Sequence, residues 1–557
     1  MDHRQSKVGV ALPLFSVFFA LGFFLQTQSG QNPLTRENVV HAEKVIGLQF
    51  SDAKRDSMLD GLKEQLDNYQ NLRKVSLPND VPPALQFNPI PLGMKLETSK
   101  KAFKMSPVPK VSVPADLEDL AFHSVGQLAQ LIKTRKVTSE QLTKMYLSRL
   151  KKYGPKLECV ITLTEDLALE QARRADREIA AGKYRGPLHG IPYGAKDLLA
   201  TKGIRTTWGS VPYKGQVIDE DASVIKRLQA AGAVLLAKLT MGELAWGDVW
   251  FSGMTRNPWN YDQGSSGSSA GSAAATAAGL VAFSIGTETY GSIVSPSTRC
   301  GTTGLRPTYG RVSRKGAMAL SWSMDKIGPI CRTAEDCALV FNAIYGPDGQ
   351  DQTVYDMPFN YDPAVNLSKL RIGYFKSAFD SAKGDRENNE AALGTLRALG
   401  VDLIPVEFQK YPINDLGIIL GAEAGAAFDE LTRSGKDDTL VRQIKDAWPN
   451  VFRLSRFIPA VEYIQANRIR YLAIQDMAKV MKDIDVYVSP PFGGENLLLT
   501  NLTGHPCVVL PSGFSKEGAP TSITFVGRLF GEAIVLAVAK KFQDATGFHL
   551  KHPTLKQ

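Results

Sequence analysis

Two serines and one lysine are the residues of this 557-residue chain that most favour chemistry. Ser268 and Ser292 lie 24 positions apart in a stretch, residues 264–311, that is dense in glycine, serine and alanine. Lys196 lies 72 positions before Ser268 and is surrounded by glycine and proline. A serine hydroxyl is a weak nucleophile and needs a base. Because lysine has an ordinary pKa of about 10.4, burial must lower the pKa of Lys196 before it can accept a proton at pH 7.

The usual base for a serine nucleophile is histidine, and none lies in the serine-rich stretch. The seven histidines of the chain are His3, His41, His123, His189, His505, His549 and His552. His549 and His552 have a spacing that could suit a metal, but they lie in a polar tail and are expected on the surface. Lys196 is therefore the better candidate base, and neither a metal nor an organic cofactor is expected.

Short elements must position these side chains. The apolar run Ile191–Ala195 predicts a buried strand that carries Lys196 at its end. The alanine-rich run Ala273–Ala278 predicts a helix that follows a glycine and serine loop. A second strand is expected over Leu280–Ile285, and the turn after it would place Ser292 beside free backbone N–H groups. Such groups can stabilise an oxyanion.

Several motifs together resemble the amidase signature family, over nearly everything from Phe122 to the C-terminus. They are Leu188–Pro192, Lys196-Asp197, Thr206–Ser210, Thr255–Trp259, Ser268–Ala275, Gly291–Ile293 and Cys300–Val312. The resemblance implies that Ser292 is the acylated nucleophile, that Ser268 is a bridging serine with a cis peptide bond, and that Lys196 is the base acting through Ser268. It further implies an oxyanion hole made by the backbone N–H groups of Thr289, Tyr290, Gly291 and Ser292.

The segment around Ser292 departs from the usual family pattern, Gly-Thr-Asp-x-Gly-Gly-Ser-Ile-Arg. Glu288 stands in place of Asp, Tyr290 in place of the first Gly of the pair, and Val294 in place of Arg. Ala270 likewise stands where Gly is usual. The three triad positions are intact, so hydrolysis stays favoured, while Tyr290 either belongs to the oxyanion hole or shapes the pocket.

A rival serine motif is Gly267–Gly271, which matches G-x-S-x-G and nominates Ser269 as the nucleophile of an α/β-hydrolase elbow. That elbow must follow a strand. The preceding residues, 257–264, are expected to be turn-like, and this disfavours Ser269.

Composition divides the chain into four segments. Residues 1–29 form a signal peptide or an N-terminal anchor, since residues 8–25 carry no charge. Cleavage is expected after Ser29 or Gly30, and the body is expected to be exported to a periplasmic or extracellular location. Residues 30–76 form a helical extension with an apolar stripe over His41–Leu72. Residues 77–117 form a proline-rich linker, extended along the main domain, which comprises residues 118–557.

The main domain is predicted to be α/β, and the resemblance implies one large domain with a central mixed β-sheet flanked by helices. An early helix begins at a Thr138–Gln141 capping box and should stop at Gly154-Pro155. Further strands are predicted at Ala233–Leu236, Arg371–Phe375, Asp485–Ser489 and Cys507–Pro511. The segment Pro405–Ile464 matches no motif and is expected to hold substrate specificity.

Charge and cysteine content limit the partners. The net charge is +9, but the basic residues are scattered without a sustained run, so no nucleic-acid partner is expected. Five cysteines are too few for a disulfide framework, although an oxidising compartment leaves the pair Cys331 and Cys337 open.

The function favoured by these observations is a hydrolase that cleaves a small-molecule carboxylic amide and releases an acid and ammonia or an amine. Two alternatives stay open: the A subunit of a tRNA-dependent amidotransferase, and a catalytically inactive binding protein. Membrane contact is expected only through the N-terminal segment, and a homodimer is one possible state of the protein.

Overall fold

The computed structural model describes residues 34–75, 77–81, 85–382 and 385–556. The chain divides into two compact units, Met1–Ser76 and Leu77–Gln557. The predicted signal peptide or anchor, residues 1–29, lies outside the described residues. Among the helices of the described part, none has the length and apolar character needed to cross a membrane.

The described part of the first unit consists of two helices, α1 (Arg36–Ile46) and α2 (Asp52–Leu72). The sequence predicts one helical stripe over His41–Leu72, and the structure breaks it at Gly47. That glycine has a φ of 69° and closes α1 with its N–H bonded to the carbonyl oxygen of Glu43. A left-handed residue of this kind ends a helix because glycine adopts it without steric cost.

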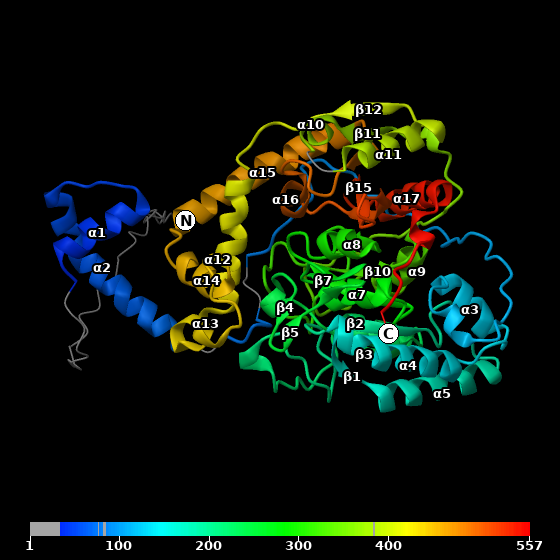
Figure 1. Ribbon diagram of the computed structural model, residues 1–557. Coiled ribbons are helices and arrows are strands. Elements are labelled where there is room, and N and C mark those ends of the chain that lie inside the picture. Colours follow the sequence, from blue (N-terminus) through cyan, green and yellow to red (C-terminus); the bar gives the residue numbers. More distant parts are fainter. Residues whose placement is uncertain (1–33, 76, 82–84, 383–384, 557) are drawn as a thin grey trace, which may run out of the picture. The chain divides into compact units, whose positions relative to one another are not determined.

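The second unit is built on a mixed sheet of eleven strands, and its order is β1-β3-β2-β8-β10-β9-β14-β15-β13-β11-β12. Figure 1 shows β1, β2 and β3 at one end of this unit and β11 and β12 at the other. The bounds of these strands are β1 Val160–Leu163, β2 Pro192–Lys196, β3 Val234–Leu239, β8 Phe283–Glu288, β9 Thr303–Arg306, β10 Lys326–Cys331, β11 Ile372–Phe375, β12 Leu403–Val406, β13 Val486–Ser489, β14 Cys507–Phe514 and β15 Pro520–Gly527. Strand β2 pairs in parallel with both β3 and β8. The strands that end next to the candidate residues therefore lie side by side.

Helices flank this sheet, which confirms the predicted α/β class with a large mixed sheet. For example, α4 and α5 pack on β3, and α17 packs on α9, β14 and β15. The helices are α3 Val125–Lys133, α4 Ser139–Leu157, α5 Glu165–Ala180, α6 Ser223–Ala230, α7 Ala270–Ala277, α8 Val294–Cys300, α9 Ala334–Ile344, α10 Lys376–Ser381, α11 Arg386–Ala398, α12 Ile418–Ala427, α13 Asp429–Ser434, α14 Trp448–Ser455, α15 Ala460–Lys482, α16 Asn496–Leu502 and α17 Glu532–Thr546. The unassigned segment Pro405–Ile464 contains α12, α13, α14 and the start of α15.

One predicted helix end is wrong. Helix α4 begins at the expected capping box, with the Thr138 hydroxyl accepting from the N–H of Gln141, but it runs through Pro155 to Leu157. Pro155 lies in the last turn, and the helix ends where Glu158 adopts a left-handed conformation and donates its N–H to the carbonyl oxygens of Gly154 and Pro155. Proline near a helix end removes only one backbone hydrogen bond, so the last turn can form around it.

The linker runs along the second unit without helix or strand in the described residues from Leu77 to Asp116. Its backbone N–H groups bond to the body of the unit: the N–H of Lys104 donates to the carbonyl oxygen of Tyr361 at 3.0 Å, and that of Ser106 to the Glu335 carboxylate at 2.8 Å. The linker therefore belongs to the same compact unit as the main sheet.

Candidate active site

Lys196 lies at the end of the buried strand β2, as predicted, and its side chain is fully buried. Its Nζ lies 2.8 Å from Ser268 Oγ, 2.8 Å from Thr287 Oγ1 and 3.1 Å from Ser269 Oγ. Three hydroxyl groups therefore surround the amine. The resemblance placed Ser268 next to Lys196, whereas Ser269 was nominated only as a rival nucleophile and Thr287 was not singled out.

The hydrogen bonds of Ser269 indicate how these hydroxyls divide their roles. Ser269 Oγ donates to the carbonyl oxygen of Thr287 at 3.0 Å and accepts from the N–H of Thr287 at 3.1 Å. Because its single hydrogen is used, Ser269 Oγ can only accept from Lys196. A neutral amine has two N–H groups and one lone pair. With Ser269 and Thr287 as acceptors, the lone pair of Lys196 is left for the hydroxyl hydrogen of Ser268.

The residues that precede the elbow motif at Ser269 differ in secondary structure from the prediction. The segment expected to be turn-like, residues 257–264, lies mostly in the paired strands β6 (Arg256–Asn257) and β7 (Asn260–Gly264), with a turn at Pro258 and Trp259 between them. This pair lies outside the main sheet, and three residues separate it from Ser268. Ser269 is fully buried and its hydroxyl is bonded on both sides, so it positions Lys196.

Burial lowers the pKa of Lys196 from its ordinary value to about 7, against the opposing effect of Asp325 and Glu288. The direction agrees with the requirement drawn from the sequence. At neutral pH a substantial fraction of Lys196 is therefore neutral and able to accept a proton.

Ser268 is buried directly before helix α7, and the Gly267–Ser268 peptide bond is cis, as the resemblance implies. A Cβ atom at Gly267 would lie 1.8 Å from the carbonyl oxygen of Gly247, so only glycine fits here. The backbone N–H of Ser269 donates to the carbonyl oxygen of Ser292 at 3.1 Å. This bond joins the segment that carries Ser268 to the one that carries Ser292.

Ser292 follows strand β8 after a turn in which Gly291 has a φ of 86°. Its side chain is buried, and so is that of Thr289, whose hydroxyl donates to Asp325 Oδ1 at 2.5 Å. Tyr290 is 46% exposed, so its side chain lies at the surface beside Ser292. Among the residues that the structure describes, none accepts a hydrogen bond from the backbone N–H groups of Tyr290, Gly291 or Ser292.

Glu288, one of the departures from the family pattern, organises the backbone around Ser292. Its carboxylate lies 2.9 Å from Arg306 Nη1, and both side chains are fully buried. It also accepts from the N–H groups of Ile293 at 2.8 Å and Val294 at 2.9 Å, and from Asn501 Nδ2 at 2.9 Å. Burial alone would raise the pKa of Glu288, but these partners outweigh it and hold the pKa below its ordinary value.

In the sequence, Glu288 stood out only as a replacement for Asp. The available signal was an acidic residue at the end of an apolar run, with an arginine 18 positions later in a second short strand. A charge in such a place needs a partner, because an unpaired buried charge is strongly disfavoured.

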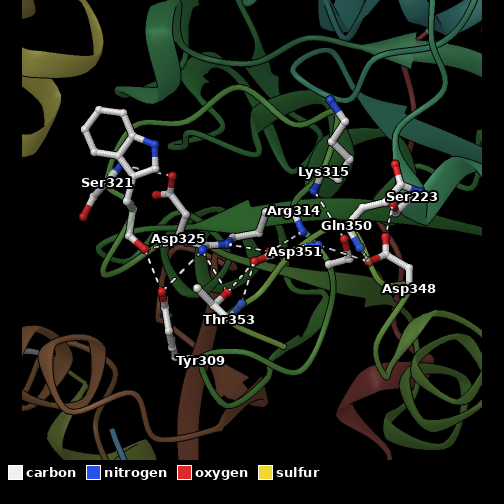
Figure 2. Close-up of polar contacts among 12 residues, drawn as sticks. Ser223, Tyr309, Arg314, Lys315, Ser321, Asp325, Asp348, Gln350, Asp351 and Thr353 are labelled. Atoms are coloured by element: carbon white, nitrogen blue, oxygen red, sulfur yellow. Dashed lines mark hydrogen bonds and ion pairs between the residues drawn. The ribbon is translucent and has the colours of Figure 1, made fainter. Parts of the chain in front are cut away.

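A cavity of about 450 Å³ adjoins this site. It reaches the candidate residues through Thr287 and Thr289, whereas Lys196, Ser268 and Ser292 are not in its lining. Polar groups line one side. Figure 2 shows Arg314, which is ion-paired with Asp351 at 3.2 Å and also donates to the Tyr309 hydroxyl at 3.3 Å.

The cysteines and histidines considered in the sequence form neither a disulfide nor a metal site among the described residues. All five cysteines are free and buried, including Cys331 and Cys337. His552 is exposed, as predicted, and His549 is half-buried, with its pKa lowered by burial. Within the described residues, no three His, Cys, Asp or Glu side chains are grouped so that they could hold a metal ion.

Comparison with known proteins places this fold in a class. The solved structure of native peptide amidase from Stenotrophomonas maltophilia has a TM-score of 0.71 and 30% identity, and the match covers 79% of this chain and 100% of that one. The A subunit of the glutamyl-tRNA(Gln) amidotransferase of Thermotoga maritima has a TM-score of 0.67 and 25% identity over 79% of this chain and 99% of its own. These proteins share the α/β architecture described above.

Sequence comparison leads to the family. The model of the Amidase family matches residues 141–536. The A subunit of the glutamyl-tRNA(Gln) amidotransferase of Marinomonas sp. (strain MWYL1) is 35% identical over 481 residues, and the match covers 78% of this chain and 98% of that protein. The chain therefore belongs to the amidase signature family, and the class of reaction is hydrolysis of an amide C–N bond.

Proposed function

We propose that the protein is a free-standing hydrolase of carboxylic amides that works through an acyl-enzyme on Lys196, Ser268 and Ser292. The observation that carries this proposal is the buried Lys196 amine, 2.8 Å from Ser268 Oγ, with its pKa lowered to about 7. A base of this pKa is matched to proton transfer at neutral pH.

The proposed reaction begins with neutral Lys196, which accepts the proton of Ser268 as Ser268 takes the proton of Ser292. Ser292 Oγ then attacks the amide carbonyl carbon and forms a tetrahedral intermediate. The C–N bond breaks as the proton returns through Ser268 to the leaving nitrogen, and ammonia or an amine departs. Water, deprotonated by the same relay, attacks the acyl-enzyme, and the acid is released. No cofactor takes part in this scheme.

The negative charge of the intermediate would lie on the carbonyl oxygen. We propose that the backbone N–H groups of Thr289, Tyr290, Gly291 and Ser292 stabilise it, since donors aimed at a developing oxyanion lower the barrier by a few kcal/mol each. Glu288 accepts hydrogen bonds from the N–H groups of the two residues that follow Ser292, and these bonds fix the backbone of the turn on the C-terminal side of Ser292. Within the described residues, no group accepts a hydrogen bond from the N–H of Tyr290, so this N–H is free for the role.

The test is covalent labelling with a fluorophosphonate, read by intact mass. We expect the wild-type protein and Ser269→Ala to gain one label, although Ser269→Ala should react more slowly. Ser292→Ala should gain none. A label that persists in Ser292→Ala and disappears in Ser269→Ala would assign the nucleophile to the elbow motif. A folded wild-type protein that takes no label and hydrolyses no amide would favour the inactive binding protein.

The pH dependence follows from the direction of the Lys196 shift. The base works only when Lys196 is neutral, so kcat/KM should rise with pH through about 7 and level off above it. The measurement is kcat/KM for one amide between pH 5 and 9. If the rising limb lay near pH 10, Lys196 would keep its ordinary pKa and the proposed base would be wrong.

The relatives support a second function, the A subunit of a tRNA-dependent amidotransferase, because proteins of that name are about a third identical over most of this chain. Such a subunit would hydrolyse glutamine, and its rate would depend on partner subunits and tRNA. Glutaminase activity of the isolated chain, assayed with and without those additions, separates the two functions.

We also propose that the protein is exported by its N-terminal segment, on the support of 18 uncharged residues at positions 8–25. An exported enzyme would meet small-molecule amides and no tRNA. N-terminal sequencing of the protein from cell fractions tests cleavage after Ser29 or Gly30 against an uncleaved anchor.

A further inference from the structure

The linker lines part of the cavity beside the candidate site. Asn79, Asp80, Leu85 and Gln86 contribute to its lining, together with Thr287 and Thr289 on the side of Lys196. A segment far from the triad in sequence therefore faces the same space as the residues around Ser292.

Asn79 binds a loop of the main domain through both polar atoms of its side-chain amide. Its Nδ2 donates to the carbonyl oxygen of Ala319 at 2.9 Å, and its Oδ1 accepts from the N–H of the same residue at 2.7 Å. Ala319 belongs to the loop between β9 and β10, whose residues Ala317–Leu320 also line the cavity. This paired bond sets the distance between linker and loop.

Phe87 holds the linker at a second point. The centre of its ring lies 3.5 Å from the guanidinium carbon of Arg470, which is buried on α15, and the ring meets that of Tyr309 edge-on at a centroid distance of 5.1 Å. Pro89 and Pro91, which follow, are buried. Because these contacts are made to buried groups of the body, the linker residues from Phe87 to Pro91 are fixed beside the cavity.

Hydrogen-bonding groups gather where the linker meets the cavity. Gln86 Nε2 donates to Gln352 Oε1 at 2.9 Å, and Asp80 lies 3.5 Å from Lys315 Nζ. Arg314 and Asp351 continue this polar side (Figure 2). The volume of about 450 Å³ lies within the range of about 300–1,000 Å³ of pockets for drug-sized ligands. Such a cavity is larger than a simple primary amide requires.

We propose that Asn79, Asp80 and Gln86 form the outer wall of the substrate cavity and select elongated amides, whose acyl part carries hydrogen-bonding groups that reach this wall. This inference rests on the proposed function. A short amide reacts at Ser292 without contacting the linker, whereas a long one needs both the room and the polar groups there.

The test modifies the wall with one thiol. All five native cysteines are buried, so Gln86→Cys offers the accessible one, and a bulky maleimide coupled there narrows the cavity. The matched control is Leu92→Cys, on the same linker, 90% exposed and outside the cavity lining. The two substrates are propionamide and N-acetyl-trialanine amide.

After coupling to Gln86→Cys, kcat/KM for N-acetyl-trialanine amide should fall at least tenfold, while that for propionamide should change less than twofold. Coupling to Leu92→Cys should change neither. Equal losses for both substrates, or no loss for the long one, would overturn the inference.

A binding measurement separates this inference from the proposed function. In a Ser292→Ala background, the dissociation constant of N-acetyl-trialanine amide should rise at least tenfold when Gln86→Cys is coupled. If the unmodified protein hydrolyses neither amide but this shift is found, the proposed function is wrong and the inference about the linker residues is supported. If the protein hydrolyses the amides but the dissociation constant does not change, the inference about the linker residues is wrong and the proposed function is supported.

Discussion

Replacing Lys196 by methionine is expected to lower kcat/KM for any amide substrate at least about 10⁴-fold, because the relay then has no proton acceptor. Methionine is apolar and close to lysine in size, so the buried position stays filled. The protein should therefore remain folded. The measurement is kcat/KM at pH 8, where the wild-type lysine is mostly neutral.

The control for this variant is Lys202→Met, a change of the same type at an exposed lysine that follows soon after strand β2. It should leave kcat/KM within twofold of the wild type. A Lys196→Met protein that is folded and retains more than a tenth of the wild-type rate would show that another group accepts the proton.

Replacing Glu288 by alanine should cost about 3–5 kcal/mol in the free energy of unfolding, because Arg306 would keep a fully buried charge without a partner. The N–H groups of Ile293 and Val294 would lose their acceptor as well. The turn that carries Ser292 should then lose its support, so activity should also fall. Urea denaturation at pH 7 measures the stability.

An exposed ion pair supplies the comparison. Glu165 lies 2.8 Å from Lys151, and both side chains are about half exposed. Glu165→Ala should cost no more than about 1 kcal/mol, because solvent screens such pairs. Equal losses in the two variants would mean that the Glu288 and Arg306 pair contributes little beyond a surface contact.

Local sequence patterns predicted the elements near the site to within a few residues. The strand expected at Ile191–Ala195 is β2, Pro192–Lys196, and the helix expected at Ala273–Ala278 is α7, Ala270–Ala277. The strand expected at Leu280–Ile285 begins three residues later, at Phe283. An apolar run shows that a segment is buried, but only pairing with its neighbours decides where the ladder of hydrogen bonds begins.

No local sequence pattern indicated the contacts between segments that are distant in the chain. Thr287 touches Lys196 from 91 positions away, and Asn79 binds Ala319 from 240 positions away. Threonine is frequent in strands and asparagine is frequent in linkers, so neither residue type by itself indicated a special role. Their roles appear only when the strands and the linker are assembled.

By itself, the sequence determined the α/β class, the pair of serines and the lysine, and the need for burial to lower the pKa of that lysine, because apolar periodicity and residue chemistry are local. The tertiary structure alone decided which hydroxyls surround Lys196, which partner balances Glu288 and which segment lines the cavity. These depend on strand order and on side chains that meet across long stretches of chain. Hydrogen bonds and ion pairs act over a few ångströms in space, whatever the separation in sequence.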